Sequence, residues 1–370
     1  MKGSPFKKLL VLILFLGIVA ALVLQFFNAR VKPIPKTLLP DTSEPEFEYH
    51  YQSPSPGSVA KTAGPEESVS DGREQLKISR DKAEAWLAKH HRNATSLLAV
   101  FRALNDTNYL NEAAKNFPND PRVQLSVLSS DVSSEDRRKW LEAFKASSPN
   151  NSLANYLSAV DYFKNGRPDA ALQELLAASD KGQIKNYAIE TLLDGEELYS
   201  DSGVSPVLTS SYAMADMTEQ NLPQLRDFKI LSQGVSEAMK QKSAAGDAAS
   251  VANLAMAGLA LSGKMDSGDS GKFLINQLVA TASERIILAQ LDQNNAYDFL
   301  NNQTPAQVVE TLKQQKTDLR QLVADFGPAQ KQMMMSDAEM ASYMQRLAIY
   351  GEIEAMKWAI QQHPPSDSQK

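Results

Sequence analysis

The chain of 370 residues contains no cysteine. It therefore has no disulfide bond, no lipidated cysteine anchor, no thiolate zinc site and no cysteine nucleophile. Histidine is also scarce, with four residues at positions 50, 90, 91 and 363. His90 and His91 are adjacent, so on a helix their side chains diverge by about 100° and cannot hold one metal ion together. We expect no metal and no cofactor.

Acidic residues outnumber basic residues after the first thirty positions. The net charge is −6, and Lys2, Lys7, Lys8 and Arg30 give residues 1–30 a charge of +4, so residues 31–370 carry −10. Nucleic-acid binding favours a basic patch or stripe. We therefore expect no nucleic-acid partner. Apolar residues make up 43% of the chain and charged residues 22%, which is ordinary for a globular protein.

One long apolar run is present, from Leu9 to Phe27, and it carries no charge. At about 1.5 Å per residue it spans roughly 28 Å, close to the ~30 Å hydrocarbon core of a bilayer. Its best cleavage site, Ile18-Val19-Ala20, would leave apolar residues on the mature N-terminus, so we expect an uncleaved anchor and keep a cleaved signal peptide as the alternative. Basic residues flank both ends and lean slightly toward a cytoplasmic N-terminus. Residues 1–30 are thus predicted to anchor the protein in a bacterial inner membrane by a single pass, with the remainder in the periplasm.

Residues 31–72 are predicted to be a disordered linker. Seven of the chain's 18 prolines fall in this segment, and it has little apolar mass. Proline density favours extended conformations, and low hydrophobicity leaves the entropy of ordering without compensation.

From residue 73 onward the pattern changes to that of helices. Apolar residues recur at intervals of three and four, as in Val308, Leu312, Leu319 and Leu322. Ser336 precedes Glu339 as in a capping box, and Thr304 precedes a first-turn proline. No segment alternates like a strand. We predict an all-α domain of about fourteen helices, each ten to twenty residues long.

A repeat stands out in the middle of the chain. Phe117-Pro118-Asn119-Asp120-Pro121 and Ser148-Pro149-Asn150-Asn151 lie 31 residues apart, proline to proline. The second is followed by small, aromatic and larger apolar residues at helical spacing: Ala159, Tyr162, Gly166, Ala171, Leu175 and Ala178. Small residues let two helices approach, and larger ones fill the space between them.

These spacings over residues 92–182 resemble the tetratricopeptide repeat, in a degenerate form with Asn155 at the usual tryptophan position. The resemblance implies antiparallel helix pairs stacked as an α-solenoid over residues 73–182, with residues 183–370 continuing it or forming a bundle. The Phe-Pro-Asn-Asp-Pro region also looks like membrane-anchored proteins of the Verrucomicrobia, a likeness that brings no activity with it. We expect Ala159, Ala171, Leu175 and Ala178 in the core, and Gly166 at a helix end.

Three short motifs suggest chemistry but lack its context. Gly258 to Met265 nearly matches a phosphate-binding loop, yet an alanine-rich helix precedes it and Met265 replaces the Ser or Thr that would hold Mg²⁺. Gly268-Asp269-Ser270-Gly271 resembles the nucleophile segment of trypsin-like proteases, which are β-barrels. Met333-Met334-Met335 is either an adaptable binding surface or, as we expect, a packed corner between helices.

These observations favour a membrane-anchored helical-repeat scaffold or adaptor that binds proteins or peptides in the groove between stacked helix pairs and performs no catalysis. Asn155, Tyr162 and Asn186 are the candidate partner-binding residues. The alternatives are a structural spacer of the cell envelope, without a groove, and a hydrolase, which would need convergent polar residues in one pocket.

Overall fold

The computed structural model describes residues 78–130 and 134–364, and the predicted anchor and linker lie outside these ranges. The described residues form fourteen α-helices and no strand, which confirms the all-α prediction. The one β-type contact that they contain is an isolated bridge between Tyr297 and Gln303. None of the described helices is both long and apolar enough to cross a membrane.

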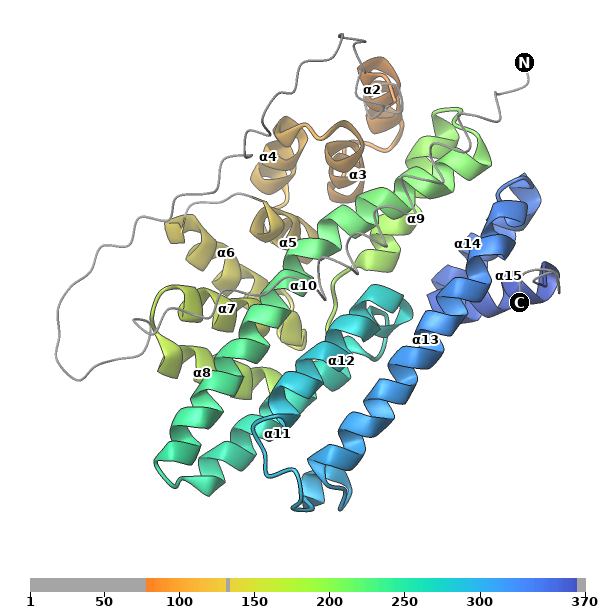
Figure 1. Ribbon diagram of the computed structural model, residues 1–370. Coiled ribbons are helices and arrows are strands. Elements are labelled where there is room, and N and C mark those ends of the chain that lie inside the picture. Colours follow the sequence, from red (N-terminus) through yellow and green to blue (C-terminus); the bar gives the residue numbers. More distant parts are fainter. Residues whose placement is uncertain (1–77, 131–133, 365–370) are drawn as a thin grey trace, which may run out of the picture. The chain divides into compact units, whose positions relative to one another are not determined.

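The first seven described helices follow one another as consecutive packed neighbours (Figure 1). They are α2 (Arg80–Lys89), α3 (Ala94–Leu104), α4 (Thr107–Asn116), α5 (Pro121–Ser129), α6 (Ser134–Ser147), α7 (Ser152–Lys164) and α8 (Pro168–Ser179). Asparagine or aspartate caps several of these helices. Asn93, Asp106, Asp120 and Asn151 each accept a backbone N–H of the first turn.

The second half of the domain contains longer helices. It comprises α9 (Ala188–Asp201), α10 (Pro206–Ala244), α11 (Ala248–Met265), α12 (Leu274–Leu288), α13 (Pro305–Met333), α14 (Asp337–Tyr350) and α15 (Glu352–Gln362), with short 3₁₀ turns η2 (Ser270–Lys272) and η3 (Asp298–Leu300). The predicted length of ten to twenty residues is wrong for α10, with 39 residues, for α13, with 29, and for α5, with nine. Each of the two long helices continues through an internal proline, Pro223 in α10 and Pro328 in α13. Packing against neighbouring helices offsets the backbone hydrogen bond that each proline removes.

Helix α10 connects the two halves. It contacts α3, α5 and α7, which are alternate members of the first series, and it also contacts α9, α11, α12 and α14 (Figure 1). Its N-terminal half buries Val207 and Met214 in one apolar cluster, and its C-terminal half buries Leu231 and Val235 in another. The face that α3, α5 and α7 turn toward α10 is therefore covered by the chain's own longest helix.

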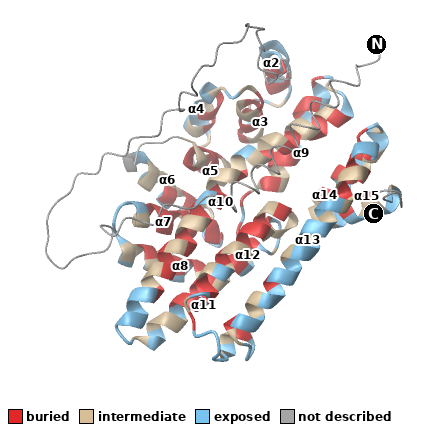
Figure 2. Cartoon of the chain, viewed as in Figure 1, coloured by how far each residue is buried: buried red, intermediate tan, exposed pale blue. Residues whose placement is uncertain are grey.

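Helix α7 is enclosed by its neighbouring helices. Ten consecutive residues, Ser152 to Asp161, are buried, so α7 has no solvent-facing side along that length (Figure 2). Helices α6, α8 and α10 all pack on it. Helix α13 differs, because most of its middle residues are exposed and only its two ends are buried (Figure 2).

The predictions made for the repeat-like segment agree with the structure. The side chains of Ala159, Ala171, Leu175 and Ala178 are fully buried. Gly166 follows the C-cap of α7 with φ +68°, the left-handed conformation expected of a glycine at a helix end. The motif at Asn150 and Asn151 also has a structural role. Asn151 caps α7 through the N–H of Leu153, and its side chain both donates to the carbonyl of Lys185 and accepts its N–H.

The segment that resembles a phosphate-binding loop is helical, as its alanine-rich context predicted. Gly258 to Met265 is continuous helix in α11, and Lys264 Nζ donates to the carbonyls of Ala178, Ser179 and Lys181 at 2.7–2.9 Å. That ammonium therefore satisfies the carbonyl end of α8 rather than a phosphate. Ser270 lies in η2 and is 1% exposed. Met333 and Met334 are packed between helices, as expected, whereas Met335 is 81% exposed.

Candidate functional site

An open pocket of about 230 Å³ lies where α10 passes α3 and α5. We call it the α3–α5–α10 pocket. It is lined by Phe101, Arg102, Asn105, Ser126, Ser129, Ser130, Asp216, Glu219 and Gln220. All three helices belong to the contact described above between the first series and α10. The pocket is thus an uncovered part of the face that α10 otherwise occupies.

Each helix presents its pocket residues at spacings of three and four, which place side chains on one helical face. Helix α5 and its C-cap contribute Ser126, Ser129 and Ser130, and α10 contributes Asp216, Glu219 and Gln220. Two serines of α5 and a third at its C-cap are a signal that the sequence contained but that was not recognised there. The position of Asp216, Glu219 and Gln220 opposite them was visible only once α10 was placed.

The polar walls of the pocket are held in place by hydrogen bonds. Arg102 Nη1 donates to Gln220 Oε1 at 2.9 Å, and Thr191 of α9 donates to the same oxygen at 3.0 Å. The hydroxyl of Tyr199 donates to Asp216 at 2.8 Å. Pro223 has no N–H to give to the carbonyl of Glu219, which leaves that acceptor without its usual helical partner. These bonds fix one cation, one carboxylate and one amide around the same space.

The charges around Arg102 are interdependent. Burial lowers the pKa of its guanidinium, and the nearby carboxylates Asp216 and Asp194 oppose that shift, so Arg102 remains a cation. Burial also raises the pKa of Asp194 to about 6, partly offset by Arg102 and Arg122. Arg122 Nη1 lies 3.8 Å from Asp194. Asp194, which interacts electrostatically with Arg102, therefore takes up its proton at a higher pH than an ordinary aspartate does.

One pocket residue has unused hydrogen-bonding capacity. Ser126 is 3% exposed, and its Oγ has no partner among the described residues. A buried hydroxyl without a partner carries a free-energy cost, so a ligand or a water that bonds to it is favoured. No histidine lines the pocket to activate its serines, and the described residues contain no cluster of three His, Asp or Glu side chains suited to a metal ion. The arrangement suits hydrogen-bonded recognition of a polar group.

None of the three residues singled out from sequence lines this pocket. Asn155 is 5% exposed and donates to Glu174 Oε2 of α8 at 2.6 Å. Tyr162 is half-buried, with its ring centroid 4.1 Å from the guanidinium carbon of Arg138 and 4.8 Å from that of Arg167. Both are engaged by the chain's own side chains, and Tyr162 is the more accessible of the two.

Asn186 belongs to a buried chain of amides that joins three parts of the fold. Its Nδ2 donates to Asn221 of α10 at 3.1 Å, and Asn221 donates to Asn276 of α12 at 3.0 Å. Asn276 then donates to the carbonyl and hydroxyl of Ser270. All four residues are at most 4% exposed. These internal hydrogen bonds account for the buried position of Asn186, so no partner molecule is needed to explain it.

A second polar cluster, between α6, α7 and α10, is likewise internally satisfied. Asp161 pairs with Arg137 and Arg138, and Asp227 pairs with Arg137 at 3.8 Å and with Lys164 at 2.8 Å. Both aspartates are buried. Because buried carboxylates need such partners, this cluster is explained by the packing of α6 and α10 on α7.

Comparisons with protein-family models, curated proteins and solved structures found no match for this chain. Inferences about function therefore rest on the chain's own geometry.

Proposed function

We propose that the protein is a membrane-anchored, periplasmic adaptor that holds a polypeptide partner at the α3–α5–α10 pocket and performs no catalysis. The observation that carries the proposal is the pocket itself. It combines a buried hydroxyl without a partner, an arginine and two carboxylates in an opening of the face between helix pairs.

The size of the pocket favours a macromolecular partner over a cofactor. Its volume of about 230 Å³ is below the range of about 300–1,000 Å³ typical of small-molecule sites. One inserted side chain or one chain end fits such a space. Arg102 and Ser126 can donate to a carboxylate or a carbonyl oxygen, while Asp216 and Glu219 can accept from an amide or an ammonium group. A single residue of a polypeptide offers both kinds of group.

A photocrosslinking residue in place of Ser129, at the half-buried edge of the pocket, tests this proposal. Irradiated native membranes should yield one discrete adduct. The adduct should disappear when Arg102→Met is added, and it should not form from the matched position Gln173, which is exposed on α8. Adducts that are the same from both positions, or that persist in Arg102→Met, would show that the pocket does not select the partner.

The anchor is part of the same proposal and rests on the apolar run Leu9 to Phe27. Alkaline carbonate washing should leave the full-length protein in the membrane pellet. A mature N-terminus near Ala21 or Arg30, read by mass spectrometry, would instead show that the segment is a cleaved signal peptide.

A further inference from the structure

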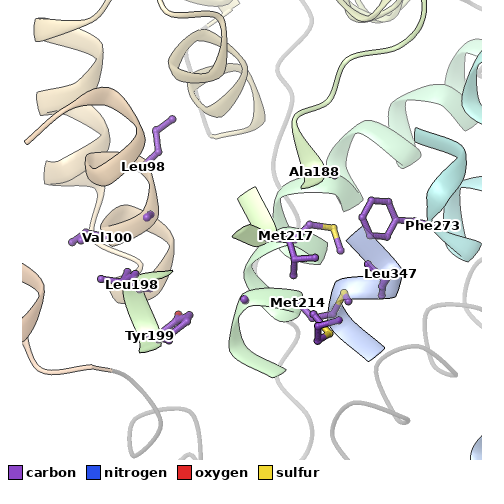
Figure 3. Close-up of a cluster of buried hydrophobic side chains, with 14 of the residues drawn as sticks. Leu98, Val100, Ala188, Leu198, Tyr199, Met214, Met217, Phe273 and Leu347 are labelled. Atoms are coloured by element: carbon purple, nitrogen blue, oxygen red, sulfur yellow. The ribbon is translucent and has the colours of Figure 1, made fainter. Parts of the chain in front are cut away.

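Methionine is concentrated in one place in this fold. Five of the chain's 12 methionines line one small cavity of about 40 Å³ between α10, the end of α13 and α14, namely Met214, Met333, Met334, Met340 and Met344. We call it the methionine cavity. Each of the five is at most 8% exposed. Figure 3 shows Met214 and Met217 of α10 extending beside Leu347 and Phe273, in the apolar cluster that surrounds the cavity.

Residues with oxygen-bearing side chains also line the methionine cavity. Gln330 of α13 lines it and is 5% exposed, and its Oε1 has no hydrogen-bond partner among the described residues. Glu352 lines the cavity as well, and one of its carboxylate oxygens accepts the N–H of Leu274 at 2.8 Å. The residues that line the cavity therefore carry thioether sulfurs, an amide oxygen that lacks a partner and a carboxyl group.

We propose that the methionine cavity binds one Cu⁺ ion. Thioether ligands select soft ions such as Cu⁺, whereas Mg²⁺ and Ca²⁺ prefer oxygen ligands and Zn²⁺ is bound by Cys, His and carboxylates. The volume suits a single ion or a water molecule. Gln330 Oε1 supplies a further neutral ligand.

The charge balance of the site also fits a monovalent cation. A buried charge is tolerated when it is paired, and the thioethers and the amide are neutral. Of the described residues, Glu352 is the one acidic residue that lines the cavity, and burial raises its pKa, so the site offers at most one negative charge and leaves a divalent ion with an excess. The sequence had led us to expect no metal, since it lacks cysteine and its adjacent His90 and His91 cannot hold one ion together on a helix. The methionine cluster forms only when α10, α13 and α14 meet.

The full-length protein, titrated with Cu⁺ without oxygen against a chromophoric Cu⁺ chelator, tests the proposal. We expect one equivalent to bind, and Ag⁺ to bind likewise and raise the Tm. The double variant Met333→Leu/Met340→Leu keeps the side-chain volumes nearly unchanged and should bind Cu⁺ at least about tenfold more weakly. The matched control Met239→Leu/Met265→Leu, whose methionines are fully buried in the other apolar cluster, should bind as the parent does.

Three results would overturn the assignment. They are the absence of stoichiometric Cu⁺ binding, an equal loss of affinity in both double variants, and an X-ray absorption spectrum of the loaded protein without sulfur neighbours. This inference is independent of the proposed adaptor function, because the crosslink at position 129 is expected to form in the Met333→Leu/Met340→Leu variant.

Discussion

Gly258 and Gly263 lie in the same helix, α11, but in opposite surroundings, and the contrast yields a sharp test of the packing. A Cβ built on Gly258 would lie 2.8 Å from Ile287 Cδ1 and 2.9 Å from Ile287 Cγ1 of α12. A Cβ on Gly263 meets nothing within 4 Å. Ile287 is fully buried, so it cannot move aside without disturbing other core side chains.

Two opposing effects determine how Gly258→Ala changes the free energy of unfolding. Replacing glycine with alanine inside a helix stabilises it by about 0.8–1.0 kcal/mol through backbone entropy. Overpacking a filled core costs about 1–3 kcal/mol. Gly258→Ala should therefore lower the free energy of unfolding by up to about 2 kcal/mol, while Gly263→Ala should raise it by up to about 1 kcal/mol. The difference between the two variants isolates the steric cost.

Calorimetry and urea denaturation of both variants beside the parent measure this difference. The expected order of Tm is Gly263→Ala, then the parent, then Gly258→Ala. Ile287→Val removes the methyl group that the new Cβ approaches most closely, and alone it should cost about 0.5–1.5 kcal/mol. In the Gly258→Ala background it should cost less or should stabilise, which a double-mutant cycle would detect. If the two alanine variants are equally stable, α11 and α12 do not approach as closely as the structure shows.

Further predictions follow from the other contacts described above. Ala171→Leu should lower the free energy of unfolding by about 1–3 kcal/mol by overpacking the core. Gly166→Val should lower thermal stability because valine is strained at φ +68°. The exposed control Gln173→Ala should change stability by no more than ~0.5 kcal/mol. An Ala171→Leu protein as stable as that control would place residue 171 at the surface. Asn221→Ala should cost about 2–5 kcal/mol in urea denaturation because it leaves Asn186 Nδ2 and Asn276 Oδ1 without these partners, and the exposed Asn294→Ala should be neutral; a loss below about 1 kcal/mol would contradict the buried amide chain. Burial raises the pKa of Asp194 from its ordinary 3.8 to about 6, so the folded protein retains a proton that the unfolded chain releases. The contribution of this group to stability is therefore full below about pH 4 and is lost as pH rises through 6. Asp194→Asn should flatten the Tm profile between those values, and an unchanged profile would show that another group titrates there.

The all-α class and many of the helix ends could be predicted from the sequence alone. Local signals decide such features. Thr304 forms a capping box with Gln307, and Gly166 ends α7, as their residue types require. The small and large apolar positions of the repeat-like segment also proved to be core, because a helical period of 3.6 identifies one buried face without knowledge of what covers it.

Only the tertiary structure decided what covers that face. The sequence suggested a groove open to a partner, with Asn155 and Asn186 on it, but α10 packs against α3, α5 and α7, and both asparagines are engaged within the chain. The α3–α5–α10 pocket and the methionine cavity likewise join residues more than a hundred positions apart. The hydrophobic periodicity of a sequence does not predict such contacts, because they depend on how helices that are distant in the chain pack against one another. The apolar run from Leu9 to Phe27 is the opposite case, since its length and lack of charge support the prediction of an anchor without any tertiary contact.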